Sequence, residues 1–189
     1  MSTETATVPT GYVAGTWHAD LSHSDVTITA RHFMVSKVRG RFNDFEATIV
    51  TAENPLDSTV TATIKAASID TRQDQRDGHI RSADFLDVEN FPEITFQSTG
   101  LRQDGEIYQL DGDLTIRGNT RPVTLELELN ATGPDAYGGT RMGVSASTTV
   151  LRKDFGINFN AVMETGGAVV GDKLEVTLEI EAVLEKPEA

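Results

Sequence analysis

The sequence predicts an all-β fold, either an antiparallel barrel or a sandwich. Apolar and polar residues alternate with a period of two through most of the chain, and turn-forming residues separate the alternating runs. This period places one face of a strand in the core and the other in water, as is typical of antiparallel sheets. The runs indicate about eight to ten strands, and closure into a barrel would remove their exposed edges.

The strands are predicted in order from their inward-facing positions. The five clearest alternating runs span residues 26–32, 60–64, 110–116, 123–129 and 174–180. Between strands, residues that favour tight turns or loops occur at Asp104-Gly105, at Gly118-Asn119, over 133–139 and at Gly171-Asp172.

One segment interrupts the strands and is predicted to form a short helix and loop near residues 72–86. It is polar and rich in helix formers, and Thr71 with Asp74 resembles a capping box. Gly78 weakens such a helix by up to ~1 kcal/mol relative to alanine. We expect this insertion to continue as a loop to Pro92 and to cross one mouth of the barrel.

The length of 189 residues suits a single domain with a sizeable core. Residues 1–11 are small, polar and unpatterned, so we predict a flexible N-terminal arm there. The barrel domain is predicted over 12–185, followed by a tail over 186–189.

The composition excludes several classes of function. A formal net charge of −13 disfavours nucleic acids and anionic membrane surfaces as partners, and the absence of cysteine excludes thiolate chemistry. No run approaches the ~20 apolar residues of a membrane span, so no stable membrane insertion is expected. The N-terminus has neither a basic start nor an apolar run of signal-peptide length, and we therefore expect a cytoplasmic protein.

Small residues on the predicted inner face bear on whether the barrel is hollow. They are Ala30, Ala47, Ala62, Gly112 and Ala146. An eight-stranded barrel has room for a solid core or for one small ligand. The small residues fit an apolar cavity, and they equally fit a core in which large neighbours fill the gaps.

The phenylalanines lie mostly near strand ends or between strands, where a barrel mouth or a lid is expected. They are Phe33, Phe42, Phe45, Phe85, Phe91, Phe96, Phe155 and Phe159. They either surround the entrance of a cavity or plug the ends of the barrel.

Neither a catalytic set nor a metal site is expected. The four histidines lack metal-ligand spacing, and nucleophile motifs and Gly-rich phosphate loops are absent. His32 shares the inward parity of Val26 and Ile28. It is therefore either a structural histidine with hydrogen-bond partners or a polar anchor in an apolar cavity.

Basic residues gather at the breaks in the strand pattern. Residues 30–42, ARHFMVSKVRGRF, contain four of the sixteen lysines and arginines and no acid. Further cations follow in the insertion (Arg72, Arg76, Arg81) and at Arg152-Lys153. If these breaks meet at one mouth, the cations form a positive rim that could hold a phosphate or carbonyl head group; otherwise they pair with the surplus acids.

Five stretches carry a resemblance to a known family. They are DLSHSDVTITARHFMVSKVRGRF (20–42), DQRDGHIRSADFLDVENFPEITFQST (74–99), LDGDLTIRGNTRPVTLELELN (110–130), LRKDFGIN (151–158) and VGDKLEVTLEIEA (170–182). With these stretches, in the family's order and over nearly all of the chain after residue 12, the sequence resembles the YceI-like family of lipocalin-like polyisoprenoid-binding proteins.

The resemblance implies an extended lipocalin-like barrel of about eight strands plus flanking strands, which binds a long polyisoprenoid or isoprenoid-quinone-like lipid without catalysis and without a cofactor. The residues expected to contact the lipid in the lumen and at the mouth are Ala30, His32, Phe33, Met34, Val38, Phe42, Ala62, Phe85, Phe91, Ile94, Phe96, Leu114, Ile116 and Phe155. The residues expected near its head group are Arg39, Arg81 and Lys153.

Two other functions stay open on the sequence alone. One is an enzyme that uses His32 or His79 on a small apolar substrate, which requires an acid or a second base near the ring. The other is a stress-related protein whose lumen has collapsed. A homodimer is likewise an open alternative to a monomer.

Overall fold

The computed structural model describes residues 6–161 and 169–188 and confirms an antiparallel barrel with additional strands. The strands are β1 (Gly15–Ala19), β2 (Asp25–His32), β3 (Ser36–Phe42), β4 (Phe45–Thr51), β5 (Thr59–Lys65), β6 (Ile69–Asp70), β7 (Glu93–Asp104), β8 (Ile107–Ile116), β9 (Asn119–Pro134), β10 (Thr140–Leu151) and β11 (Val170–Leu184). The helices are α1 (Asp74–Arg81) and the short 3₁₀ helices η1 (Leu21–His23), η2 (Pro55–Asp57), η3 (Ala66–Ser68) and η4 (Arg152–Phe155).

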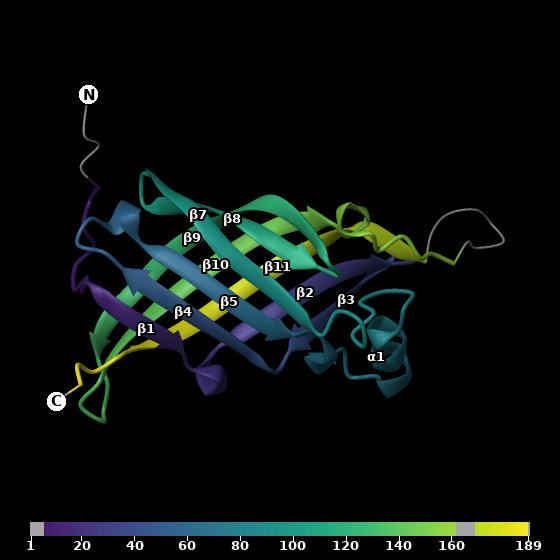
Figure 1. The fold of residues 1–189 in the computed structure, drawn as a ribbon, viewed down its shortest axis with the longest axis horizontal. Helices are drawn as coiled ribbons and strands as arrows, with labels where there is room; N and C mark the ends of the chain where they lie inside the picture. Colours follow the sequence, from purple (N-terminus) through teal and green to yellow (C-terminus); the bar gives the residue numbers. More distant parts are fainter. Residues whose placement is uncertain (1–5, 162–168, 189) are drawn as a thin grey trace.

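The barrel closes because its first strand pairs with its last. The order around it is β1, β4, β5, β7, β8, β9, β10 and β11, and β1 returns to β11 through the pairs Trp17–Leu184 and Ala19–Ala182 (Figure 1). Each neighbouring pair is antiparallel. Because successive side chains of a strand point to opposite faces, residues two apart on a strand share the inner face.

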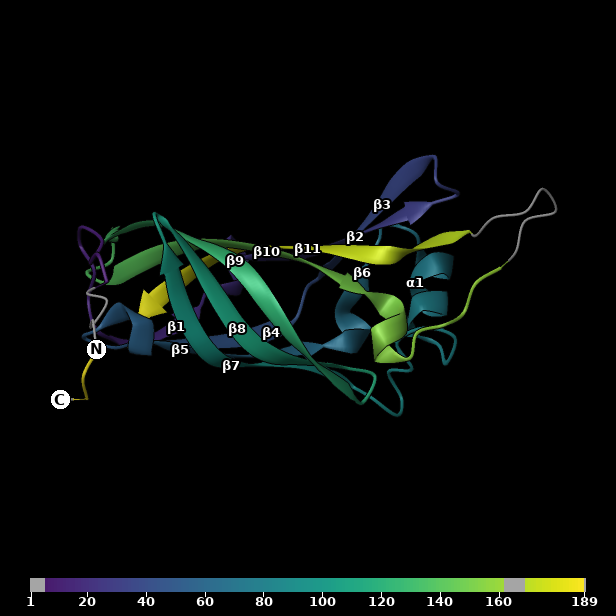
Figure 2. The same ribbon diagram turned by 90° about the horizontal axis from the view of Figure 1, so that it is seen from above.

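Three strands extend the sheet beyond the barrel. β2 pairs with residues 170–179 of β11, β3 pairs with β2, and β6 adds two residues to β3. One edge of β11 is therefore divided between β1 and β2. Seen from above, the β2–β3 hairpin rises away from the barrel at the end that carries α1, opposite to the two termini (Figure 2).

Most predicted turns are confirmed, and one is wrong. Gly105 and Gly118 adopt φ angles of 64° and 70° in the hairpins β7–β8 and β8–β9, where the left-handed conformation suits glycine. Gly171 and Asp172 do not precede the last strand. They lie inside β11, where the pairing with β2 shifts between Val170 and Leu174, because a bulge interrupts the ladder without ending the strand.

The predicted insertion is helical only over α1, and the predicted capping box is wrong. The N-cap is Gln73, whose side chain accepts from the backbone N–H of Arg76. Thr71 instead donates from its backbone and its hydroxyl to the buried carboxylate of Asp77. Buried next to β6, Thr71 is a partner of the helix rather than its cap. No helix in the described part of the chain is long and apolar enough to cross a membrane.

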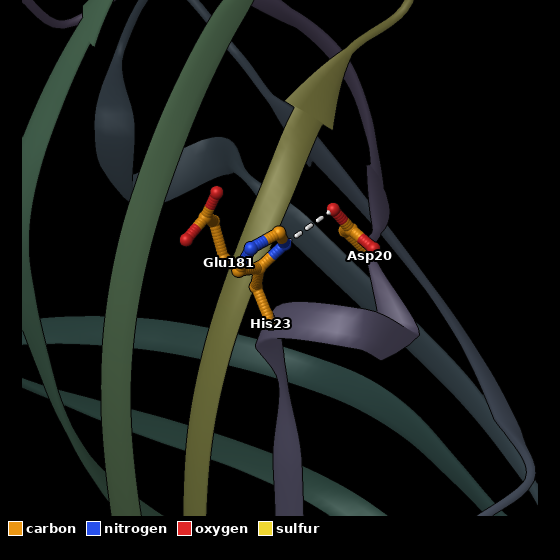
Figure 3. Close-up of side chains that lie close together, drawn as sticks. All are labelled: Asp20, His23 and Glu181. Carbon is orange, nitrogen blue, oxygen red and sulfur yellow. Dashed lines mark hydrogen bonds and ion pairs between the residues drawn. The ribbon is translucent and has the colours of Figure 1, made fainter. Parts of the chain in front are cut away.

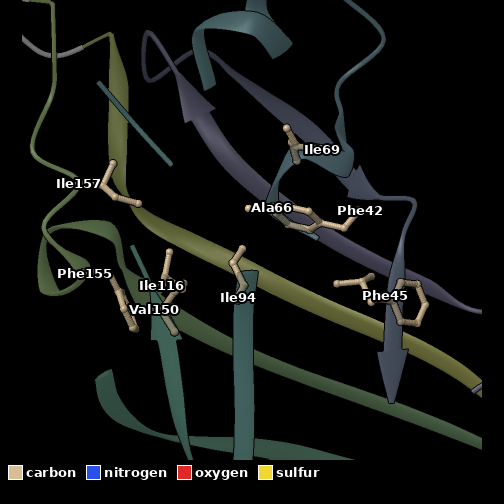
Figure 4. Packing of buried hydrophobic residues seen from close by; sticks show 10 residues of the cluster. Phe42, Phe45, Ala66, Ile69, Ile94, Ile116, Val150, Phe155 and Ile157 are labelled. Carbon is tan, nitrogen blue, oxygen red and sulfur yellow. The ribbon is translucent and has the colours of Figure 1, made fainter. Parts of the chain in front are cut away.

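The buried apolar residues form two clusters inside the barrel. The larger one lies toward the end that carries α1 and includes Phe42, Phe45, Ile94, Ile116 and Phe155 (Figure 4). The smaller one surrounds Trp17, whose indole N–H donates to the hydroxyl of Thr51 over 2.9 Å. The predicted inner faces are thus confirmed, and Trp17 fills the barrel near its closure.

The space next to Gly112 is filled, so this small inward residue does not line a cavity. A Cβ atom on Gly112 would lie 2.3 Å from Cζ of Phe96, on the neighbouring strand β7. The phenyl ring therefore fills the space that the missing side chain leaves. At this position the alternative of a core filled by a large neighbour is correct.

The predicted N-terminal arm lies partly outside the described residues. Its described part contacts the hairpin β7–β8, since the backbone N–H of Thr7 donates to the side chain of Gln103 and the hydroxyl of Tyr108 donates to the carbonyl of Thr7. These contacts anchor residues near position 7, and the flexibility of the arm stays a prediction.

Gly112→Ala should destabilise the fold by about 1–3 kcal/mol, because the added methyl group overlaps the ring of Phe96 and the backbone carbonyl of Gln97. Urea unfolding of the two proteins measures the difference. Gly100→Ala is the control, since it adds the same group to the neighbouring strand with nothing within 4 Å. Equal losses in the two variants would contradict the packing argument.

Candidate functional site

An apolar cavity of about 530 Å³ lies at the end of the barrel that carries α1. Its volume falls in the range of small-molecule sites, about 300–1,000 Å³. The extended sheet supplies one wall, through Ile28, Ala30, Val38, Phe42, Ile69 and Leu174. The opposite side comes from α1 and the segments after it and after η4, through Ile80, Phe85, Leu86, Ile157 and Phe159.

Within residues 6–161 and 169–188, the polar residues that line the cavity include no acid. They are Arg31, His32, Gln73, Gln75, Arg76, His79 and Arg152. The described lining contains three arginines, and acids lie next to it: Asp172 is 3.4 Å from Arg152, and Asp84 is 2.8 Å from His79.

Arg152 is the buried charge of the cavity, with 1% of its surface exposed. Its guanidinium donates to the backbone carbonyls of Gly171, Ile157, Phe159 and Val170 and lies 3.4 Å from a carboxylate oxygen of Asp172. Burial lowers the pKa of Arg152 from its ordinary value, an effect that Asp172 opposes. Arg152 thereby joins the bulge of β11 to the segment after η4.

Three hydrogen-bonded contacts dock α1 on the sheet. Asp77 accepts from Thr71, and Arg76 donates back to the hydroxyl and the carbonyl of Thr71 over 2.7 and 2.8 Å. Arg81 donates to the carbonyls of Ala67 and Ile69. Because these bonds fix both ends of the helix, its first turn is held against the cavity.

An aromatic cluster connects the two segments that cover the cavity. The rings of His79, Phe85 and Phe159 meet edge to face, with centroids 5.0–5.4 Å apart. Nε2 of His79 also lies 2.8 Å from a carboxylate oxygen of Asp84. This cluster holds α1 and the segment after η4 together where they meet over the cavity.

Five of the predicted ligand residues line this cavity: Ala30, His32, Val38, Phe42 and Phe85. Met34 lines a second hollow of about 440 Å³ on the outer side of the same sheet. Ile94, Ile116 and Phe155 are buried in the main core instead. Phe33 is exposed at the tip of the β2–β3 hairpin.

The remaining predicted ligand residues lie elsewhere on the barrel. Phe91 packs over Gly118, and Phe96 packs over Gly112. Ala62 on β5 and Leu114 on β8 are partly exposed and belong to the inner face of the barrel. No ligand contact of these residues is tested, so their roles stay predictions.

The three predicted head-group residues do not line the cavity. Arg39 is exposed on the outer face of β3, Arg81 is engaged by backbone carbonyls, and Lys153 lies 3.2 Å from Asp172. Arg76 and Arg152 line the cavity, and Arg31 lines both the cavity and the hollow on the outer side of the sheet.

Sequence reasoning missed Arg152 because alternation carries no information inside a 3₁₀ turn. Arg152 and Lys153 are adjacent in η4, and the structure buries the first and exposes the second. The two adjacent basic residues at the end of a strand predict a turn at this place. They do not show which of the two side chains is buried. The sequence predicts Phe159 near the mouth of the barrel, and the structure shows that it lines the wall of the cavity.

A second cluster of polar groups, Asp20, His23 and Glu181, lies near the barrel closure (Figure 3). A guanidinium already serves as its cation: Arg141 lies 2.8 Å from Asp20, 2.7 Å from Glu181 and 3.1 Å from Asp135. The bond to Arg141, followed by those to Ser22 and His23, holds the pKa of Asp20 well below its ordinary value. The cluster thus ties β1, β10 and β11 together and is explained without a metal ion.

Comparisons with known proteins agree with this architecture. The model of the YceI-like domain matches residues 17–182. Protein YceI of Escherichia coli O6:H1 is 37% identical over 165 residues, which cover 87% of this chain and 83% of that protein.

Two solved structures are similar in fold. BcnA of Burkholderia cenocepacia superposes with a TM-score of 0.76 at 21% identity, covering 86% of this chain and 98% of that one. A polyisoprenoid-binding domain from Saccharophagus degradans superposes with a TM-score of 0.66 at 15% identity, covering 89% of this chain and 98% of that one.

Arg152→Met should destabilise the protein by about 3 kcal/mol or more, because it leaves buried backbone carbonyls without a donor. Arg152→Lys should lose less, about 1–3 kcal/mol, since an ammonium keeps the charge but cannot reach all four carbonyls. Chemical denaturation measures both. Lys153→Met, in the same turn and beside the same Asp172, should stay within about 0.5 kcal/mol of the parent.

The lowered pKa of Asp20 makes the barrel closure sensitive to acid. Its contribution to stability is fully present above the unfolded pKa of 3.8 and is lost as the pH falls through the lower folded value. Asp20→Asn should therefore be less stable than the parent at neutral pH, and the difference should shrink below about pH 4. Urea unfolding over a pH series tests this, with the exposed Asp113→Asn as control; a difference that is constant with pH would contradict it.

Proposed function

Since the chain belongs to the YceI-like family, we propose that it is a non-catalytic binding protein that holds an amphiphilic polyisoprenoid or isoprenoid-quinone-like lipid in its barrel. The observation that carries this proposal is the apolar cavity, whose described lining contains arginines and no acid. The polyisoprenoid-binding domain of Saccharophagus degradans, which shares the fold, supports the choice of ligand class.

An apolar surface extends from the cavity along β11 and can take a longer apolar chain. Val176, Leu178 and Ile180 of β11 pack on the main core and are only partly buried. They point inward, since the residues between them, such as Glu179, are exposed on the outside. Val176 and Leu178 lie opposite Ile28 and Val26 in the pairing of β11 with β2, so the apolar wall of the cavity continues along this part of the sheet.

The cationic lining supports a head group that is electron-rich. A quinone carbonyl or a phosphate would be attracted by the positive potential around Arg76 and Arg152, whereas an ammonium head group would be repelled. The guanidinium of Arg152 is already bonded to carbonyls and acts through its field. Arg76 uses Nε and one terminal nitrogen on Thr71, and its other terminal nitrogen has no partner in the described part of the chain, so it could bind a ligand.

The enzyme hypothesis has one supporting contact, the bond between His79 and Asp84. In this pair, however, the imidazole also packs edge to face against Phe85 and Phe159. Those contacts place the ring between the two segments that cover the cavity. We propose that the bond between His79 and Asp84 holds these segments in position. The collapsed-lumen hypothesis is disfavoured by the volume of the cavity.

Isoprenoid quinone at about 100 times its Kd should stabilise the protein by about 2.7 kcal/mol, which raises Tm by about 5–10 °C. Ala30→Trp should abolish this shift, because the indole enters the cavity. Ala131→Trp places the same side chain at an exposed position on β9 and should keep the shift. Thermal unfolding with and without the lipid measures all three proteins.

Native mass spectrometry of the protein purified without detergent provides an independent test. It should find a lipid bound to the parent and to Ala131→Trp, but not to Ala30→Trp, and it also counts the subunits. No bound lipid together with no thermal shift would overturn the proposed function.

A further inference from the structure

The tip of the β2–β3 hairpin exposes three consecutive apolar side chains. Phe33, Met34 and Val35 are 42%, 62% and 86% exposed. Phe33 and Met34 adopt φ angles of 52° and 58°, a backbone conformation that residues other than glycine rarely adopt. The turn is nevertheless anchored, because the N–H of Phe33 donates to the carbonyl of Val169 and that of Val35 to the carbonyl of His32. A fixed turn thus presents apolar groups to water.

Cations flank this tip on the outer face of the hairpin. Arg31 lies directly opposite Lys37, and Arg39 follows on the same face. Like charges in opposite positions of two strands destabilise the pairing, so this arrangement is unfavourable for the fold itself. Two acids, Asp172 and Glu175, line the same outer hollow as Arg31 and Lys37. Glu175 lies 3.5 Å from Lys37, and Asp172 is paired with Arg152 and Lys153. The hairpin is therefore a basic element on an acidic protein.

The tip lies beside the mouth of the cavity. Arg31, His32 and Val38, on the two strands that carry the tip, line the cavity. The hairpin also projects beyond the barrel, at the end opposite to the termini (Figure 2). A surface that received Phe33, Met34 and Val35 would thus lie next to the opening.

We propose that this hairpin tip docks on an anionic lipid surface. Apolar side chains enter the boundary between head groups and acyl chains, and neighbouring lysines and arginines pair with lipid phosphates. The rest of the chain is acidic and is repelled by the same surface, which confines the contact to the tip and makes it sensitive to salt. The inference rests on the proposed function in one respect: the contact would serve to exchange lipid between a membrane and the cavity.

Vesicle sedimentation tests the contact directly. The protein should bind vesicles of equimolar phosphatidylglycerol and phosphatidylcholine at low ionic strength, where the Debye length is about 30 Å, and much less at about 0.15 M salt. It should not bind pure phosphatidylcholine vesicles. The absence of binding to the anionic vesicles at low salt would overturn the proposal.

Matched variants locate the contact. Met34→Ser with Val35→Ser should lower vesicle binding at least tenfold, and Lys37→Gln with Arg39→Gln should lower it by about fivefold for each charge. The controls are Tyr137→Ser, for an exposed apolar residue, and Arg102→Gln with Lys186→Gln, for two charges on other parts of the surface. Equal effects of the hairpin variants and the controls would refute docking through the tip.

A single cysteine reports insertion, since the chain has none of its own. An environment-sensitive fluorophore on Val35→Cys should shift to shorter wavelength with anionic vesicles, and the same label on Tyr137→Cys should not. If the tip instead covers a second copy of the chain, native mass spectrometry will show a dimer that Met34→Ser with Val35→Ser dissociates, and vesicle binding will be unaffected by these changes. That result would overturn the proposal.

Failure of docking and failure of the proposed function give different results. Ala30→Trp should lose the quinone-induced thermal shift and keep vesicle binding, whereas Met34→Ser with Val35→Ser should keep the thermal shift and lose vesicle binding. If the parent protein binds vesicles without ever showing the thermal shift, docking stands and the lipid-carrier function falls.

Discussion

The architecture depends on how one strand edge is shared. A strand edge can pair with only one neighbour at each residue, and β11 gives its C-terminal end to β1 and residues 170–179 to β2. The first choice closes the barrel around Trp17. The second carries the sheet away from the barrel axis as the β2–β3 hairpin, which is why the molecule is closed at one end and has a cavity at the other.

Hydrogen bonds between polar groups in an apolar surrounding stabilise the end of the barrel that contains the cavity. The bulge in β11 and the segment after η4 present backbone carbonyls toward the interior, and burying them without donors would be costly. Arg152 supplies the donors from a single side chain. On the other side of the cavity, Asp77 and Arg81 dock α1 on β6 and η3. The cationic character of the cavity is thus in part a consequence of holding its walls together.

Charge is distributed unevenly over the molecule. Acids dominate the outward positions of β9 and β11, as in Glu126, Glu128 and Glu179. Near the barrel closure, Arg141 is ion-paired with three carboxylates. At the cavity and on the hairpin beside it, the sign is reversed. This distribution supports the proposal of an amphiphile with an electron-rich head group as the ligand.

Much of the fold could be predicted from the sequence because alternation is a local signal. Each run of period two identifies a strand and its inward face, and the glycines of the hairpin turns mark where strands end. The same signal placed His32, Ala30 and Val38 on one face, and these residues do meet at the cavity. It could not choose between Arg152 and Lys153, because a 3₁₀ turn has no two-residue period. Nor could it show that Phe96 fills the space over Gly112, since that contact depends on the register between β7 and β8.

The sequence by itself determined the strands, their inner faces, the acidic surface and the basic stretch 30–42. Only the tertiary structure decided which strands close the barrel, where the cavity lies and which cations line it. The physical reason is that strand identity follows from the residues of one segment, whereas a cavity is formed by segments far apart in the chain. Arg76 and Arg152 are brought to the same cavity by the docking of α1 and by the bulge of β11, and neither event is encoded by the pattern of a single strand.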